Sequence, residues 1–286
     1  AHVERQLVRP GRRHDEAARR RGRRAVVIGR ARRPQQLQHA LAADKRDVGN
    51  RHVQAGLAGI ADERRTGLVG TNQDNGVGIR LLQDGDLPVE AAAQAGAGLF
   101  YLGYLNLLGA LDALQDGQTG AARVLARART AGMVTCVDLV SKAGPDFAAV
   151  VAASLPQIDY LFLNEVEAAL ATGIEISGPD DQIGIGQAAQ ALLAAGVNRA
   201  VIIHTPALGL WAGHGGMVTR LPDPATLIVN PLGAGDAFCA GVIWGIHQGW
   251  EPLRALGLGH RAAAECLKGE TATGTIPRLE VLLSSL

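Results

Sequence analysis

The stretch NPLGAGDAFCAG, residues 230–241, combines three glycines with a single carboxylate and leads directly into apolar sequence. Pro231 ends a strand, because proline has no N–H for a ladder and restricts the residue before it. Gly233, Ala234 and Gly235 are small enough for the backbone to approach a ligand, and the apolar residues that follow predict a helix that starts deep in the protein. The first N–H groups and the dipole of such a helix favour an anion such as phosphate.

Asp236 lies in the first turn of this predicted helix, beside the anion site. Its position alone is consistent with an acid that stabilises the helix dipole. The same carboxylate can accept the proton of a substrate hydroxyl while the neighbouring N–H groups stabilise a transferred phosphoryl group. Both roles are compatible, and the second predicts phosphoryl transfer with Asp236 as the catalytic base.

A second polar group is predicted from DYLFLNEVEAALATG, residues 159–173, where Asn164 follows an apolar run and Glu167 falls in the first turn of the next helix. An amide and a carboxylate at a strand end can organise a hydrated Mg²⁺, which keeps several waters and touches few protein groups. Alternatively, Glu167 is only an acid at a helix start. Asp138, at the end of VTCVDL, is another strand-end carboxylate.

The elements that must position these residues follow an α/β pattern, since short apolar runs alternate with Ala-rich segments of helical length from about residue 97. Several runs are continuously apolar, as parallel strands covered on both faces require. Residues 211–230 indicate an antiparallel excursion at one sheet edge. The expected strands are 99–105, 133–140, 160–164, 200–205, 208–213 and 225–230. The expected helices are 118–131, 145–154, 165–172, 186–195, 234–248 and 252–267.

NPLGAGDAFCAG also resembles the carboxy-terminal signature of the ribokinase/PfkB family of carbohydrate and nucleoside kinases, and NEVE resembles the N-x-x-E segment of that family. The stretches LFYLGYLNLLGALDAL, VTCVDLVSK and AAAECLKGETATGTIPRLEVLL extend the resemblance to about residues 95–286. It implies a ribokinase-like α/β fold, a mostly parallel sheet covered by helices on both faces, with the family's lid absent or altered.

The resemblance further implies a sugar or nucleoside as the acceptor, ATP as the phosphoryl donor, Mg²⁺ and, as in some relatives, K⁺. By the resemblance, Asp236 is the base, residues 233–235 bind the phosphoryl group, and Asp138 lies near the substrate. Asn164 and Glu167 would organise Mg²⁺ and the phosphates. The nucleotide is expected at a set of residues near the later strands: His204, Thr205, Gly209 and the segment 262–274. There the chain reads TPALGLWAG, which departs from the family's T-x-G-x-x-G.

The amino-terminal part does not match, which predicts a basic segment over residues 1–84 and a kinase domain over 85–286. The family's early Asp, G-G-x-x-x-N segment and β lid are not found, and the 16 residues between Leu82 and Leu99 are too few for a lid and its strands. Residues 1–84 are therefore a divergent substrate module, a disordered basic extension, or a stretch not translated in the ancestral frame.

Charge separates the same two parts, because residues 1–80 hold 18 Lys and Arg against 8 Asp and Glu, while the remainder holds 10 against 19. Basic clusters suit nucleic acid, but residues 1–80 contain no aromatic residue to stack on bases, which disfavours that function. A non-catalytic or truncated nucleotide-binding relative stays as the main alternative to a kinase, and a nucleic-acid binder as a third.

Other classes of protein are disfavoured by what the sequence lacks. It has no run of 18 apolar residues and no signal-peptide pattern, which predicts a cytoplasmic protein without a membrane partner. Cys136, Cys239 and Cys266 lie far apart and are expected to be buried thiols rather than a disulfide or zinc framework. P-loop, nucleophile-elbow and H-E-x-x-H motifs are missing. A homodimer, as in some relatives, is one possible assembly.

Overall fold

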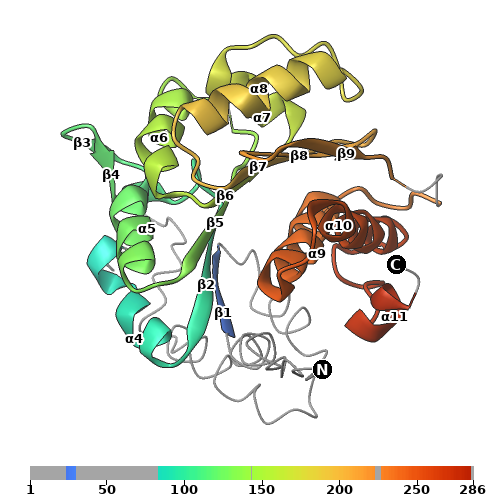
Figure 1. Cartoon of the computed structure of the whole chain (residues 1–286), viewed down its shortest axis with the longest axis horizontal. Helices are drawn as coiled ribbons and strands as arrows, with labels where there is room; N and C mark the ends of the chain where they lie inside the picture. The colour runs from blue at the N-terminus through green and yellow to red at the C-terminus, as the bar shows by residue number, and fades with distance from the viewer. Residues whose placement is uncertain (1–23, 30–82, 143, 223–226, 285–286) are drawn as a thin grey trace, which may run out of the picture.

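The structure, a computed structural model, describes residues 24–29, 83–142, 144–222 and 227–284. Of residues 24–29 it describes the backbone alone. A central seven-stranded sheet has the order β1-β2-β5-β6-β7-β8-β9 (Figure 1). Neighbouring strands from β1 to β7 pair in parallel, and the last two pairings are antiparallel. The strands are β1 (Arg24–Gly29), β2 (Ala97–Gly103), β5 (Val134–Asp138), β6 (Tyr160–Leu163), β7 (Ala200–His204), β8 (Gly209–Gly213) and β9 (Gly216–Arg220). The predicted mostly parallel sheet is confirmed, as is the antiparallel excursion at its edge.

Helices cover both faces of this sheet, as predicted (Figure 1). One face carries α4 (Val89–Gln94), α5 (Gly120–Thr130), α6 (Phe147–Ser154), α7 (Glu165–Thr172) and α8 (Gln182–Ala194). The other carries α9 (Ala234–Gln248) and α10 (Pro252–Leu267), and α11 (Leu279–Leu283) packs against α10. A short hairpin of β3 (Leu114–Gln115) and β4 (Gln118–Thr119) precedes α5. Three 3₁₀ turns, Asp84–Asp86, Gly109–Leu111 and Leu155–Gln157, complete the described elements.

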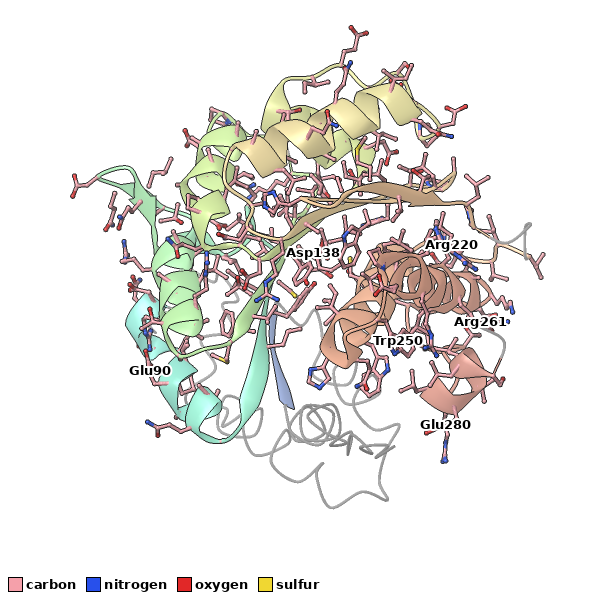
Figure 2. The ribbon with its side chains drawn as sticks, in the orientation of Figure 1. Glu90, Asp138, Arg220, Trp250, Arg261 and Glu280 are labelled. Carbon is pink, nitrogen blue, oxygen red and sulfur yellow. The ribbon has the colours of Figure 1, made fainter. Side chains whose placement is uncertain are left out.

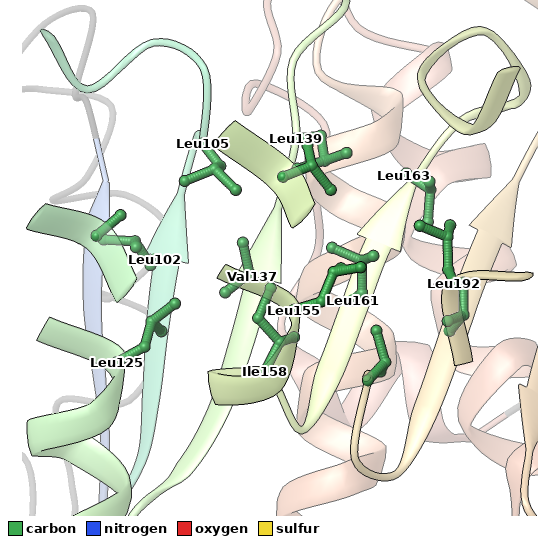
Figure 3. Close-up of a cluster of buried hydrophobic side chains, with 14 of the residues drawn as sticks. Leu102, Leu105, Leu125, Val137, Leu139, Leu155, Ile158, Leu161, Leu163 and Leu192 are labelled. Carbon is green, nitrogen blue, oxygen red and sulfur yellow. The ribbon is translucent and has the colours of Figure 1, made fainter. Parts of the chain in front are cut away.

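The strands are apolar on both sides because alternate residues enter two different cores. Leu161 and Leu163 of β6 belong to the cluster beneath α4 to α8, which is drawn in Figure 3. Phe162, between them, belongs to the opposite cluster with Phe238 and Val242 of α9. All three strand residues are completely buried, so the sheet forms a rigid layer between two sets of helices.

The prediction of a strand over residues 225–230 is wrong. Residues 223–226 lie outside the described part, and residues 227–230 form no strand. Their side chains do not pack on the sheet, since Leu227 is 76% exposed and Ile228 is 60% exposed. The backbone N–H of Val229 instead donates to the carbonyl of Leu267 at the end of α10. Hydrophobicity alone therefore misled the strand assignment.

Two further differences concern element positions. Helix α8 begins at Gln182, four residues before the expected start, because the side chain of Asp181 accepts the N–H of Gly184 and caps it. Strand β1 lies within the basic segment, where no strand was expected, and pairs with β2. The rest of residues 1–84, apart from 83 and 84, lies outside the described residues, so the domain division and the altered lid stay predictions.

No helix in the described part of the chain is long and apolar enough to cross a membrane.

Thr119 anchors the start of α5, and removing its hydroxyl should destabilise the protein. The completely buried Thr119 accepts the N–H of Ala122 at 3.0 Å, so we expect Thr119→Ala to lower the free energy of unfolding by about 1 kcal/mol. Thr130→Ala, at the exposed end of the same helix, is the matched control and should change it by less than about 0.5 kcal/mol. Urea unfolding of both variants measures the difference, and equal values would contradict the capping role.

Candidate functional site

The predicted site residues lie at the edge of the sheet that is formed by the carboxyl ends of its parallel strands. Asp138 is the last residue of β5, Asn164 follows β6, and His204 ends β7. The first turn of α9 reaches the same edge, since Gly235 packs against the ring of His204. Figure 2 shows Asp138 in the middle of the molecule, where the sheet meets α9.

The turn before α9 has a backbone conformation that favours glycine. Gly233 is the N-cap residue with φ of 89°, a left-handed conformation that favours glycine. A Cβ atom at this position would lie 2.5 Å from the Cβ of Ala272, so the segment 262–274 lies directly against the turn. Asn230 shapes the approach, because its amide oxygen accepts the N–H of Leu232 and its amide nitrogen donates to the carbonyl of Glu270. The structure therefore brings together two regions that the sequence assigned to phosphate and nucleotide.

Helix α9 continues from this turn through Ala234, Gly235 and Asp236. The N–H groups of a first helical turn have no carbonyl four residues earlier in the helix, so this one carries the positive end of the helix dipole. Gly235 has no room for a side chain, because its Cβ would lie 2.9 Å from Cε1 of His204. Backbone N–H groups at the positive end of a helix can bind an anion, and we call residues 233–235 the anion turn.

Asp236 is exposed, contrary to the expectation of a deeply buried helix start. The reason is that the buried face of α9 begins one residue later, at Ala237. The hydroxyl of Tyr104 donates a hydrogen bond to Oδ1 of Asp236. Burial and then the charge of Asp236 raise the pKa of Tyr104, so its proton stays on the phenol. The carboxylate is thus placed to receive a hydrogen bond from an alcohol.

Asp138 is a buried carboxylate with several donors. It is 4% exposed, and its oxygens accept the Tyr101 hydroxyl at 3.1 Å and the N–H of Leu139 at 3.0 Å. The sulfur of Cys239 lies within 4.8 Å of one of its oxygens. Burial raises the pKa of Asp138 well above its usual range, and the charges of Glu167 and Asp236 raise it further. Three carboxyl groups therefore interact electrostatically at this edge of the sheet.

Asn164 and Glu167 form a capping box at the start of α7. The amide oxygen of Asn164 accepts the N–H of Glu167 at 2.9 Å, and Oε2 of Glu167 accepts the N–H of Asn164 at 2.8 Å. Oε1 of Glu167 accepts the hydroxyl of Ser141, which in turn accepts the amide of Asn164. Burial raises the pKa of Glu167 above its ordinary value. The helix-start interpretation of Glu167 is confirmed, and a contact with a hydrated cation through water stays compatible with it.

His204 faces the anion turn, whereas its two predicted companions have structural contacts. Burial and then the neighbouring His260 lower the pKa of His204 to about 4, so its ring is neutral at pH 7. Thr205 donates from its hydroxyl to the carbonyl of Pro179 at 2.6 Å, which holds the loop after β7. Gly209 lies under His260, where a Cβ atom would come within 2.8 Å of Nε2.

Sequence reasoning did not single out Tyr101, Tyr104, Ser141 or Cys239 as site residues. The one available signal was the pair of tyrosines three residues apart in YLGY, at the carboxyl end of a predicted strand. The other contacts arise from the topology of the fold and not from sequence neighbours. Tyr104 and Asp236, for example, are 132 residues apart in the chain.

A family model described as pfkB family carbohydrate kinase matches residues 105–279, which include the anion turn and the capping box.

Solved structures share the fold at low sequence identity. Ribokinase from Arabidopsis thaliana, complexed with ribose and ATP, is 20% identical, with 68% of this chain and 57% of that chain covered and a TM-score of 0.53. Adenosine kinase from Sinorhizobium meliloti is 18% identical, with 72% and 59% covered and a TM-score of 0.54. Phosphofructokinase-2 from Escherichia coli, in complex with potassium, is 17% identical, with 68% and 59% covered and a TM-score of 0.53. The chain thus covers less than two thirds of each of them, and at these identities the likeness shows the fold.

Proposed function

The chain belongs to the pfkB family of carbohydrate kinases, and from that premise we propose that it transfers the γ-phosphoryl group of ATP to a hydroxyl of a sugar, nucleoside or related small molecule. The observation that carries the proposal is the start of α9, where a left-handed Gly233 leads into a first helical turn that contains Asp236. The hydroxyl of Tyr104 already donates to this carboxylate, in the way that an acceptor hydroxyl would.

The proposed steps use this chain's own groups. Asp236 accepts the proton of the acceptor hydroxyl as that oxygen bonds to the γ-phosphorus and ADP leaves. The backbone N–H groups of the turn 233–235 stabilise the negative charge on the transferred group. The acceptor displaces the Tyr104 hydroxyl from Oδ1 of Asp236. Asp138, one strand away from Tyr104, is proposed to lie near the acceptor.

A divalent cation fits the oxygen-rich edge of the sheet, where the three interacting carboxyl groups favour positive charge. Asn164 and Glu167 are proposed to hold Mg²⁺ through its waters rather than by direct bonds. The reason is that their side-chain oxygens already accept each other's backbone N–H groups. Bound there, Mg²⁺ would neutralise charge on the ATP phosphates. K⁺ is a further proposed cofactor, as the potassium complex of phosphofructokinase-2 suggests. The nucleotide is proposed near His204, Thr205, Gly209 and the segment 262–274.

A second candidate is a nucleotide-binding relative that has no acceptor site. The observation in its favour is that the family's early Asp and G-G-x-x-x-N segment are not found in this sequence. A cytoplasmic location, a homodimer and the lack of a nucleic-acid partner stay predictions.

The deciding experiment measures ADP release by the purified chain with Mg·ATP and potassium against a panel of sugars and nucleosides. Turnover that depends on one acceptor class supports the kinase. ATP binding without turnover on any acceptor supports the second candidate, and binding of neither ATP nor an acceptor contradicts both.

Removing the charge of Glu167 should weaken the use of Mg²⁺. Glu167→Gln keeps one oxygen that can accept from Asn164 or Ser141, but it loses the second acceptor and the negative charge, so we expect the Mg²⁺ concentration for half-maximal rate to rise by about 10- to 100-fold. Glu165→Gln, in the same first turn, is the matched control and should leave that concentration nearly unchanged. Magnesium titrations of ADP release compare the two, and equal shifts would assign the effect to the general charge of the helix start.

A further inference from the structure

Three side chains with different donor atoms converge beside the anion turn. A carboxylate oxygen of Asp138, a ring nitrogen of His204 and the sulfur of Cys239 all lie within 4.8 Å of one another. They come from the end of β5, the end of β7 and the first turns of α9. The residues that the structure describes contain no other such group of three. Because the ligands are far apart in the sequence, no spacing motif indicates the cluster.

We propose that Asp138, His204 and Cys239 form a binding site for a soft divalent transition metal such as Zn²⁺. The donor set supports this chemistry, because thiolate and imidazole suit Zn²⁺, whereas Mg²⁺ prefers oxygen alone. Three protein ligands leave one tetrahedral position for water or a substrate oxygen. The site is therefore different in kind from the Mg²⁺ contact proposed at Asn164 and Glu167.

The charges of these ligands suit a buried divalent ion. Cys239 is 1% exposed and Asp138 is 4% exposed, while His204 is only partly buried and lies on the side open to the anion turn. One carboxylate and one thiolate balance the two positive charges of the ion, which limits the cost of burying it. Tyr101 donates to Oδ2 of Asp138, the kind of outer contact that orients a ligating carboxylate.

The exchange on binding is simple. In the absence of metal Cys239 is a buried free thiol beside Asp138. The S–H bond breaks, its proton leaves to solvent, and the sulfur electron pair forms the bond to the metal. A carboxylate oxygen of Asp138 binds the same ion. No oxidation or reduction takes place.

Cobalt titration of the full chain tests the proposal without any kinase activity, so its failure and the failure of the proposed function are distinguishable. Co²⁺, the usual spectroscopic substitute for Zn²⁺, should bind one equivalent per chain with a cobalt–thiolate charge-transfer band, and Zn²⁺ should displace it. Cys239→Ser should abolish the band. His204→Gln should weaken binding at least about 10-fold.

Two matched variants control for the chain's other thiols. Cys136→Ser and Cys266→Ser remove buried free cysteines that do not belong to the cluster, and both should keep the band. Circular dichroism verifies that each variant is folded. A wild-type chain without the thiolate band, or a band that persists in Cys239→Ser, would overturn the proposal, even if one of the variants fails to fold.

Discussion

Asp236→Asn should lower the kcat of ADP release by about 10²- to 10⁴-fold, because the amide keeps the size of the side chain but cannot accept the acceptor's proton. The hydrogen bond from the phenol of Tyr104 shows that this carboxylate is accessible to an O–H donor. ATP binding should be nearly unchanged, since the N–H groups of the turn 233–235 are backbone atoms that the substitution leaves in place. The acceptor-dependent rate and the affinity for ATP are measured on the same preparation.

Asp116→Asn is the matched control for this substitution. Asp116 is an exposed residue with φ of 51° in the turn between β3 and β4, where asparagine is tolerated as well as aspartate. The variant removes the same charge, so its kcat should equal that of the wild type. If Asp236→Asn retains its rate, Asp236 is not the base; if it loses ATP binding instead, the carboxylate has a structural role.

The helices around the site were predictable because their ends carry local signals. Helices α9 and α7 have the expected bounds, 234–248 and 165–172. Left-handed glycines, Gly233 and Gly249, lie on both sides of α9, and the capping box at Asn164 starts α7. Such signals depend on neighbouring residues alone, so they are readable without any tertiary structure.

The partners of the site residues were not predictable in this way. Tyr104 reaches Asp236, and Cys239 reaches Asp138, only because β2 and β5 are neighbours in the sheet and α9 packs across their ends. Strand order is a long-range property, and local sequence patterns do not reveal it. The strand prediction for residues 225–230 was wrong for a related reason. An apolar run forms a strand only where a neighbouring strand is available to pair with it.

Gly241→Ala should destabilise the protein by about 1–3 kcal/mol, although alanine favours a helix over glycine by about 1 kcal/mol. A Cβ atom at this position would lie 2.7 Å from the carbonyl oxygen of Leu258 and 2.8 Å from the Cα of Gly259. Both atoms belong to the backbone of α10, which cannot move aside as a flexible side chain would. The last small residue of the signature is therefore explained by contact between two helices, whereas Gly233 is explained by its turn.

Gly186→Ala should change stability in the opposite direction, which separates the effect of close helix contact from that of helix propensity. Gly186 also lies inside a helix, α8, but its Cβ would meet only the end of the Met217 side chain, at an ordinary 3.7 Å. Helix propensity should therefore dominate, and the variant should be more stable than the wild type by up to about 1 kcal/mol. Urea unfolding measures both changes. Opposite signs would show that close contact of α9 and α10 requires the glycine, whereas stabilisation by both substitutions would mean that the two helices are farther apart in solution.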